Sequence, residues 1–279
     1  EFRRVLFRSG SFPEDHVIRI ITEVNEPLSR AGYDVTNLER FGLMIRNSEN
    51  AAYNYHKQMV SSGNAWSTSD GQQMLWDAER TPVTMIAYAP YMSEAAPDAS
   101  LAVNALTNQT TEENVKSSDF LLMKATVDPE QDLTADGKLK ISLSHAMSKL
   151  LIKITVNGTT DAAMNKLGDM SINGAVVNGI CDLSATVPIV VPAPDAVVAT
   201  VAPYKGTESC ECILPPQKIA EGFSVNFSYD GKLYIWTAKE AIELEKGVEH
   251  TLTLNVNTTV RLAAKMARNW ATGQLIDRN

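Results

Sequence analysis

Alternation of apolar and polar residues with a period of two is the feature that most limits how this chain can fold. It is clearest in FSVNFSYDGKLYIWTA, residues 223–238, where the first apolar positions are Phe223, Val225, Phe227 and Tyr229. Successive side chains of a strand point to opposite faces, so this spacing places all four on one face of a sheet. Asp230-Gly231 then supplies the positive φ angles of a tight turn before the alternation resumes. The segment predicts a β-hairpin with a type I′ turn.

The same alternation recurs along the chain. It predicts strands at residues 17–24, 41–47, 81–90 and 248–257. Helical signals are few, the clearest being a short segment at residues 159–168 with a Thr near its start and a Gly at its end. Many short strands joined by turn-rich connections predict an all-β fold, and the length favours two tandem β-sandwich domains with few short helices.

A polar, turn-rich segment, DPEQDLTADGK at residues 128–138, predicts a domain boundary. We expect an N-terminal domain over residues 10–135 and a C-terminal domain over residues 136–279. The three Asp residues of the segment lie four positions apart, whereas a calcium loop places its carboxylates on alternate positions. The segment is therefore interpreted as a solvated linker.

The segment GKLKISLSHAMSKLLIKITVNG, residues 137–158, changes its alternation part-way. Apolar residues occupy odd positions as far as Met147 and even positions from Leu150 onward. A shift of one residue turns every later side chain to the opposite face, so a bulge or bend is predicted here. His145 lies beside the shift, and without a nearby nucleophile or carboxylate in the sequence it is interpreted as a buried structural residue.

Charge and hydropathy exclude two classes of partner. The net charge is −8 at pH 7, and Lys and Arg residues are scattered singly without a basic stripe, which argues against a nucleic-acid partner. No run of about 18 apolar residues occurs, so no membrane-spanning helix is predicted.

The chemically reactive residues show no arrangement typical of an enzyme or a metal site. Paired carboxylates, a catalytic triad and a phosphate-binding loop are all missing from the sequence. The four histidines and Cys181, Cys210 and Cys212 lack the spacing of zinc ligands. An odd number of cysteines makes no disulfide framework, although one bond to Cys181 remains open. We therefore expect no catalytic residues, no cofactor and no metal.

Several motifs occur in a fixed order. They are WDAERTPVTMIAYAP at residues 76–90, DFLL at 119–122, HAMSKL at 145–150, Pro216-Gln217, GKLYIWTA at 231–238 and GVEH at 247–250. In this order they resemble the fimbrillin family of Bacteroidetes surface proteins, the subunits of type V pili. The resemblance spans residues 16–270, and His250 stands where the family usually has another aromatic residue.

The resemblance implies two transthyretin-like β-sandwich domains and a role without catalysis. Family members are exported as lipoproteins to the outer membrane and lose an N-terminal strand to a protease that cuts after an arginine. A strand from a neighbouring subunit then fills the vacated groove. The implied partners are other fimbrial subunits and, for an adhesin, a ligand on a host or bacterial surface.

The family's cleavage position matches Arg30-Ala31, in the polar loop NEPLSRAGYDVTNLERF that follows the first predicted strand. Arg40 is a second candidate, but it adjoins the apolar strand at 41–47 and is expected to be less accessible. An exposed loop is also where unprocessed arginines are common, so a purely structural role for Arg30 stays open.

A candidate donor strand lies near the C-terminus, where Val260, Leu262, Ala264 and Met266 alternate. Pairing of its backbone to an open sheet edge would give affinity, and pockets for alternate side chains would give register. Residues 260–270 could equally form the last strand or helix of their own domain, because Ala, Lys and Met favour a helix.

A second function is an exported carbohydrate-binding surface module. It would require a planar row of exposed aromatic residues, and the candidates are Trp66, Trp76, Tyr88 and Tyr91. Two of these, Trp76 and Tyr88, belong to the family motif at residues 76–90.

The first nine residues, EFRRVLFRS, resemble the translation of a common sequencing adapter. On that interpretation the natural protein starts near Gly10, and these nine residues belong to neither domain core. The export signal and lipid-bearing cysteine that the resemblance implies are then missing from this sequence.

Overall fold

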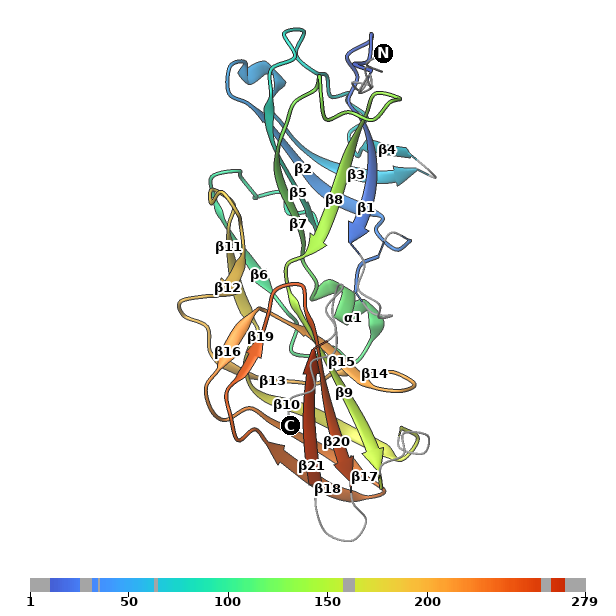
Figure 1. The fold of residues 1–279 in the computed structure, drawn as a ribbon, viewed down its shortest axis with the longest axis vertical. Coiled ribbons are helices and arrows are strands. Elements are labelled where there is room, and N and C mark those ends of the chain that lie inside the picture. The colour runs from blue at the N-terminus through green and yellow to red at the C-terminus, as the bar shows by residue number, and fades with distance from the viewer. Residues whose placement is uncertain are drawn as a thin grey trace, which may run out of the picture. The chain divides into compact units, whose positions relative to one another are not determined.

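The computed structural model describes residues 11–25, 32–34, 36–62, 65–157 and 164–256, and the backbone of residues 262–268. Nearly all elements of this part of the chain are strands, joined by one α-helix, α1 (Glu112–Ser117), and one 3-10 turn, η1 (Ala51–Tyr53) (Figure 1). The predicted all-β fold is confirmed. Residues 1–9 lie outside the described residues.

The chain divides into two compact units, and each is assembled from separate stretches of sequence. The first unit contains residues 1–25, 34–99 and 121–144, and the second contains residues 26–33, 100–120 and 145–279. These limits differ from the predicted 10–135 and 136–279. The turn-rich segment at 128–138, predicted to be a linker between domains, instead connects β7 (Leu121–Val127) to β8 (Lys138–His145) inside the first unit. The prediction differs because turn residues occur in the connections of hairpins as well as in linkers.

The first unit is built on a seven-stranded sheet. Its strands are β1 (Arg19–Asn25), β8, β7, β5 (Val83–Ala89), β2 (Arg40–Asn47), β3 (Tyr55–Ser62) and β4 (Ala65–Thr68), in that spatial order. β1 pairs with β8 in parallel, whereas β2 pairs antiparallel with both β3 and β5. The end strands β1 and β4 contact each other, so the sheet curls until its two edges meet.

Tyr88, in the motif at residues 76–90, packs in the core of this unit. It is fully buried on β5, opposite Gly42 on β2. A Cβ atom at Gly42 would lie 2.3 Å from the Tyr88 ring, so the ring fills the space that a side chain would need. The Tyr88 hydroxyl donates to the Met92 carbonyl at 2.8 Å and lies 2.7 Å from Nε2 of His56.

In the described residues, the second unit contains four smaller sheets and α1. One sheet has β13 (Val198–Val201), β10 (Leu167–Val176), β17 (Ser224–Tyr229) and β18 (Lys232–Thr237). Another has β14 (Tyr204–Lys205), β15 (Cys210–Leu214), β9 (Ser148–Val156), β20 (Glu249–Val256) and β21 (Leu262–Arg268). The remaining sheets are β12 (Val190–Pro192) with β11 (Asn178–Asp182) and β6 (Ser100–Asn104), and β16 (Gln217–Ile219) with β19 (Ile242–Leu244).

The predicted hairpin is present as β17 and β18. The two strands pair antiparallel from Ser224–Thr237 to Tyr229–Lys232. Asp230 and Gly231 have φ angles of 49° and 76°, as a type I′ turn requires at both central positions.

The predicted irregularity near His145 is a break between two strands. β8 ends at His145 in the first unit's sheet, and β9 begins at Ser148 in the five-stranded sheet of the second unit. The two residues between them, Ala146 and Met147, are fully buried. The change of parity therefore marks the point at which the chain passes from one unit to the other.

His250 is a buried polar residue in the core of the second unit. It lies on β20 opposite Leu150 of β9, and its Nε2 accepts a hydrogen bond of 3.0 Å from the backbone N–H of Glu245. Burial lowers the pKa of His250 to about 4, because the charged imidazolium loses its hydration. The ring must stay neutral for the N–H of Glu245 to have its acceptor.

This geometry predicts an acid-sensitive second unit. The unfolded chain binds a proton at His250 below pH 6.5 and the folded chain only near pH 4, so stability is present above pH 6.5 and is lost as the pH falls toward 4. The loss amounts to about 3 kcal/mol for a shift of this size. Urea unfolding of the wild type and His250→Gln between pH 4 and 7 measures it. Gln keeps an acceptor without titrating, so its stability should change less with pH, and parallel curves for the two proteins would contradict the assignment.

Candidate functional site

The first strand, β1, is the most distinctive functional candidate in the described chain. It lies at one end of the seven-stranded sheet and pairs with β8 from Arg19–Lys138 to Asn25–Ser144. One face of this segment is buried in the core. It carries Ile18, Ile20 and Val24, which are 4–7% exposed. Burial of three such side chains contributes about 5–9 kcal/mol before the cost of ordering the strand.

β1 also contacts the opposite end of the sheet. The indole N–H of Trp66 on β4 donates to the hydroxyl of Thr22 at 3.0 Å. The Trp66 ring in turn meets Phe41 of β2 edge to face, with the ring centroids 4.7 Å apart. β1 thus bridges β8 and β4, and its removal would separate the two ends of the sheet.

The residues before β1 are held by backbone pairing. The Ile18 N–H donates to the Met74 carbonyl at 2.9 Å, and the Trp76 N–H donates to the His16 carbonyl at 2.8 Å. Trp76 itself is 2% exposed. This part of the motif at residues 76–90 therefore secures the start of the first strand.

Polar side chains on the exposed face of β1 add little holding energy. Lys140 lies 2.8 Å from Glu23, and Asn25 donates to Ser144 at 2.8 Å. Both Lys140 and Glu23 are more than two-fifths exposed, and exposed ion pairs are worth about 0–1 kcal/mol. Buried apolar contacts and backbone pairing, rather than charge, keep β1 in place.

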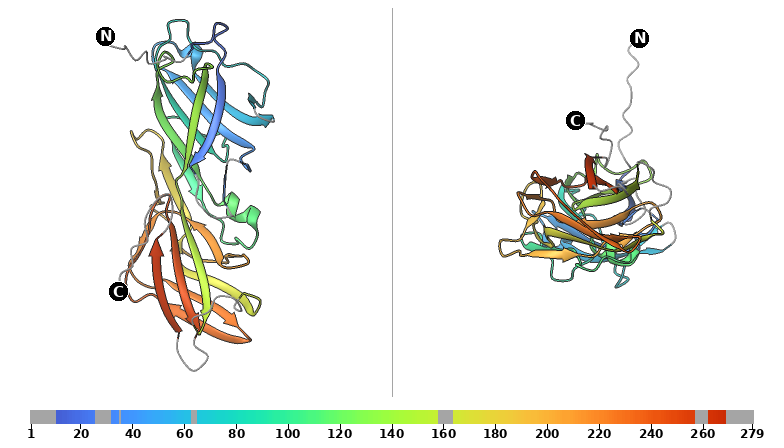
Figure 2. Two further views of the ribbon diagram at one scale, coloured as in Figure 1. Left: turned by 45° about the vertical axis from the view of Figure 1, so that its right-hand side comes forward. Right: turned by 90° about the horizontal axis from the view of Figure 1, so that it is seen from below.

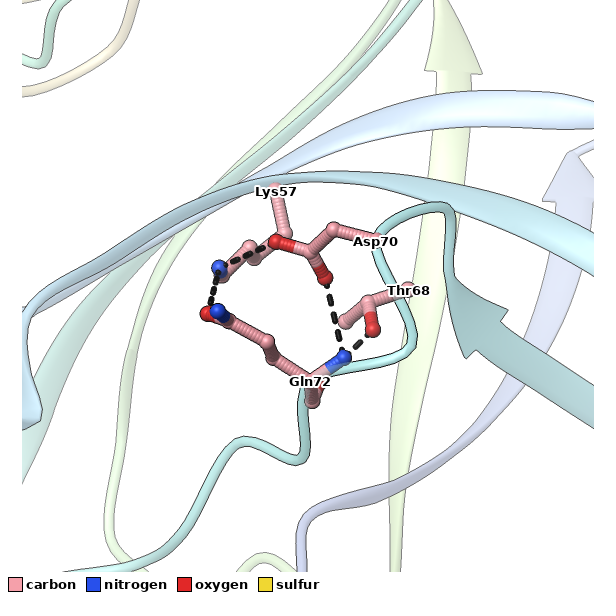
Figure 3. Close-up of polar contacts among 4 residues, drawn as sticks. All are labelled: Lys57, Thr68, Asp70 and Gln72. Carbon is pink, nitrogen blue, oxygen red and sulfur yellow. Dashed lines mark hydrogen bonds and ion pairs between the residues drawn. The ribbon is translucent and has the colours of Figure 1, made fainter.

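A polar turn fixes the end of β4, the strand that carries Trp66 (Figure 3). The ammonium of Lys57 donates to Asp70 at 2.6 Å and to Gln72 at 2.9 Å. The hydroxyl of Thr68 donates to the Gln72 carbonyl at 2.6 Å, and the Gln72 N–H donates to Asp70 at 3.0 Å. The Lys57 ammonium lowers the pKa of Asp70 to about 2. Thr68, Asp70 and Gln72 form the turn, and Lys57 of β3 binds it from the neighbouring strand.

The candidate processing residues Arg30 and Ala31 lie outside the described residues. The chain is described as far as Asn25 of β1 and again from Gly32. Arg40, the second candidate, is the first residue of β2 and pairs with Val60 of β3. Its backbone is thus held in a sheet, whereas proteases bind extended, accessible chain.

The donor candidates lie on β21, with the exception of Val260, which is outside the described residues. β21 pairs antiparallel with β20, placing Leu262, Ala264 and Met266 opposite Val256, Leu254 and Leu252. The segment is therefore a strand, not a helix, and here it is the end strand of its own sheet (Figures 1 and 2).

The aromatic candidates for carbohydrate binding do not form an exposed row. Trp76 is 2% exposed and Tyr88 is fully buried. Trp66 and Tyr91 are half-buried, and Trp66 is engaged with Thr22 and Phe41. Stacking on a sugar needs open ring faces, which the two buried residues cannot offer.

The three cysteines are free and buried. Burial raises the pKa of Cys181 to about 11 and that of Cys210 to about 12, and it raises the pKa of Cys212 as well. Within the described residues, no three His, Cys, Asp or Glu side chains are grouped as a metal site would need. The same part of the chain has no helix long and apolar enough to cross a membrane.

The second unit contains a buried polar cluster that the sequence did not predict. The Asp119 carboxylate lies 2.8 Å from Nδ1 of His145, with both side chains buried. It also accepts hydrogen bonds from the backbone N–H groups of Tyr33 at 3.1 Å and Phe120 at 2.9 Å. Asp119 and His145 belong to two separate motifs, DFLL and HAMSKL. The presence of both motifs in one chain was the sequence feature that could have indicated this contact.

Comparison with known proteins gives a consistent result. A model of a fimbrillin-like family matches residues 29–269. A proposed cell adhesion protein from Bacteroides ovatus ATCC 8483 superposes with a TM-score of 0.69 at 17% identity, over 95% of this chain and 99% of its own. A proposed cell adhesion protein from Bacteroides uniformis ATCC 8492 superposes with a TM-score of 0.67 at 16% identity, over 92% of this chain and 98% of its own.

A more distant structure has the same fold. The tip fimbrial protein Mfa3 from Porphyromonas gingivalis, with a C-terminal truncation, superposes with a TM-score of 0.53 at 9% identity, over 91% of this chain and 99% of its own. No curated protein is similar to the chain in sequence. At these identities the structural likeness establishes the fold alone.

The packing of β1 predicts that one face of it controls its release. Ile20→Ala removes a buried side chain opposite Leu139, and such truncations cost about 2–5 kcal/mol. Amide hydrogen exchange across β1 and β8 should accelerate, while exchange in the second unit stays unchanged. Ile21→Ala, on the opposite and half-buried face, is the matched control and should have a much smaller effect. Equal acceleration by both variants would show that the buried face does not hold β1.

Proposed function

Because the chain belongs to the fimbrillin-like family, we propose that it is a fimbrial subunit or adhesin that assembles by protease-triggered strand exchange. The family match and the fold shared with fimbrial and cell adhesion proteins support the subunit or adhesin role. In this proposal the role is structural rather than catalytic, and the principal partners are other fimbrial subunits.

The single observation that supports strand exchange is the placement of β1. It is the first strand of the described chain, it bridges β8 and β4, and its buried face is aliphatic. A strand in that position can be replaced by another of similar pattern, since β-augmentation needs only free backbone groups and pockets for alternate side chains. The vacated place would be lined by Leu139, Ile141 and Leu143 of β8, all 0–1% exposed with β1 present.

Cleavage at Arg30-Ala31 would detach β1 from the rest of the chain. β1 ends at Asn25 and β2 begins at Arg40, so a cut between them leaves β1 attached through non-covalent contacts alone. The sequence around Arg30 has the family's arginine followed by a small residue. Processing at this bond is therefore proposed as the trigger.

The donor is proposed to be the segment carrying Val260, Leu262, Ala264 and Met266. β21 is an end strand paired on one side by β20, so it can leave its sheet without disrupting strands beyond it. Four alternate side chains buried in a neighbour's groove would contribute about 6–12 kcal/mol before ordering costs. The cost of separating β21 from β20 reduces this gain.

The proposed location is the bacterial surface, reached by export as an outer-membrane lipoprotein precursor. Incorporation into a fimbrium there brings the subunit into contact with other cells, and a host or bacterial surface ligand is the proposed second partner. The burial of Trp76 and Tyr88 gives the carbohydrate-binding alternative no support.

An arginine-specific protease tests the trigger. Cleavage of the purified chain should release a fragment ending at Arg30 and yield oligomers visible by size-exclusion chromatography and electron microscopy. Arg30→Ala should block both the cut and the oligomers, while the control Arg40→Ala should leave both intact. Oligomers formed by Arg30→Ala, or complete cleavage without any oligomer, would contradict the proposal.

A reversible lock tests the release of β1 itself. Glu23 and Ser142 are partners across the β1–β8 pair and lie on its half-buried outer face. Glu23→Cys with Ser142→Cys should form a disulfide that retains β1 after cleavage, and reduction should restore assembly. The buried native thiols should not compete for pairing. Assembly by the oxidised, cleaved variant would show that β1 need not leave.

A further inference from the structure

The residues just beyond the proposed cleavage bond have their own docking site in the second unit. β1 belongs to the first unit, but Gly32 and Tyr33 belong to the second. The backbone N–H of Tyr33 donates to Oδ2 of Asp119 at 3.1 Å. The attachment of this segment is therefore independent of the attachment of β1.

Gly32 approaches the same carboxylate closely. Its φ angle is +113°, in the region that favours glycine, and a Cβ atom there would lie 3.2 Å from Oδ2 of Asp119 and 3.7 Å from Cδ1 of Ile213. A larger residue would be strained by the backbone angle and crowded by the carboxylate. The position is thus shaped for glycine.

Helix α1 contributes the other side of the site. Thr111 caps the helix by accepting from the Asn114 N–H at 3.2 Å, and Val115 is fully buried beneath it. This fixes Lys116 with its ammonium 5.4 Å from the centre of the Tyr33 ring, in the range of a cation–π contact. Burial, followed by the charges of Asp119 and Glu113, raises the pKa of Tyr33 to about 12.

Asp119 is itself held rigidly. Its side chain is fully buried, Nδ1 of His145 lies 2.8 Å from Oδ2, and the Phe120 N–H donates to Oδ1 at 2.9 Å. A carboxylate that is buried against His145 and accepts the Phe120 N–H is pre-organised, so it can accept the Tyr33 N–H without first losing side-chain freedom.

We propose that Asp119, Lys116 and the space beside Ile213 form an anchor for the new N-terminus, which keeps Gly32-Tyr33 docked on the second unit when β1 departs. The inference rests on the proposed function for its purpose, because it needs a cut between residues 25 and 32. The anchor prevents the freshly cut end from following β1 or from re-entering the place that β1 vacated. A cut that leads to assembly would therefore have to lie just before Gly32 and Tyr33, so that both residues stay on the anchored side.

The test replaces residues 26–31 with the site of an unrelated sequence-specific protease, so that the cut does not depend on the natural enzyme. In the cut protein, the Tyr33 amide should remain protected from hydrogen exchange, and an aminopeptidase should stop before Tyr33. Asp119→Ala should accelerate exchange at Tyr33 by about tenfold or more, as loss of a hydrogen bond to a charged acceptor implies. Trimming should then continue past Tyr33.

Two milder variants keep the test valid if Asp119→Ala does not fold. Lys116→Ala and Gly32→Ala leave the Asp119–His145 contact in place, and each should raise exchange at Tyr33 and permit further trimming. Asp195→Ala, which removes an exposed carboxylate of the same unit, is the control and should behave as the wild type. An unprotected Tyr33 amide in the cut wild type, or unchanged protection in all three variants, would overturn the anchor.

The readout is separate from assembly. A cut chain that fails to polymerise yet keeps Tyr33 protected would contradict strand exchange and support the anchor. A cut chain that polymerises while its Tyr33 amide is unprotected would support strand exchange and contradict the anchor.

Discussion

Closure of the seven-stranded sheet by its first strand is the constraint on which the first unit depends. β8 and β4 are the neighbours of β1, and Trp66 reaches across from β4 to Thr22 to complete the closure. Loss of β1 therefore removes its backbone pairing with β8 and its side-chain contact with β4, and so it exposes the edge of β8 and separates the two ends of the sheet. Exposed edges recruit other strands, and this is the physical basis of the proposed strand exchange.

The structure shows which contacts the residues of the ordered motifs make. Tyr88 fills the space left by Gly42, and Trp76 lies in the backbone pairing that precedes β1. The motifs DFLL and HAMSKL meet at the Asp119–His145 contact. In the sequence, Asp119 and His145 lie next to the limits of the units at 120/121 and 144/145. Buried polar groups must be satisfied, so substitution of Asp119 or His145 is expected to be costly.

Local patterns predicted local structure well. The hairpin at residues 223–238 and the interruption near His145 follow from a period of two, which any single strand displays. The division of the chain into units could not be predicted in the same way. Residues 100–120 join the second unit through contacts far away in sequence, and the turn signals at 128–138 are the same for a hairpin and a linker. Helix α1 was missed because six residues carry too little periodicity.

The candidate site was only partly accessible from sequence. The strand at 17–24 and the alternation from Leu262 to Met266 were visible, but the partner of each strand was not. The parallel pairing of β1 with β8 joins residues more than a hundred positions apart, and no local pattern encodes it. The contact of Asp119 with Tyr33 joins residues 86 positions apart, and it depends on a backbone N–H that every residue except proline possesses.

The placement of β1 in one unit and β21 in the other has a consequence for the geometry of a polymer. If β21 of one subunit takes the place of β1 in the next, the two surfaces in contact are different, and the contact is heterologous. Such a contact does not pair two copies symmetrically into a closed dimer. Under the proposed exchange it would continue in one direction, so the filament would have unlike ends: one would present a vacant place and the other an unused strand. Growth and termination at these ends would then require different partners.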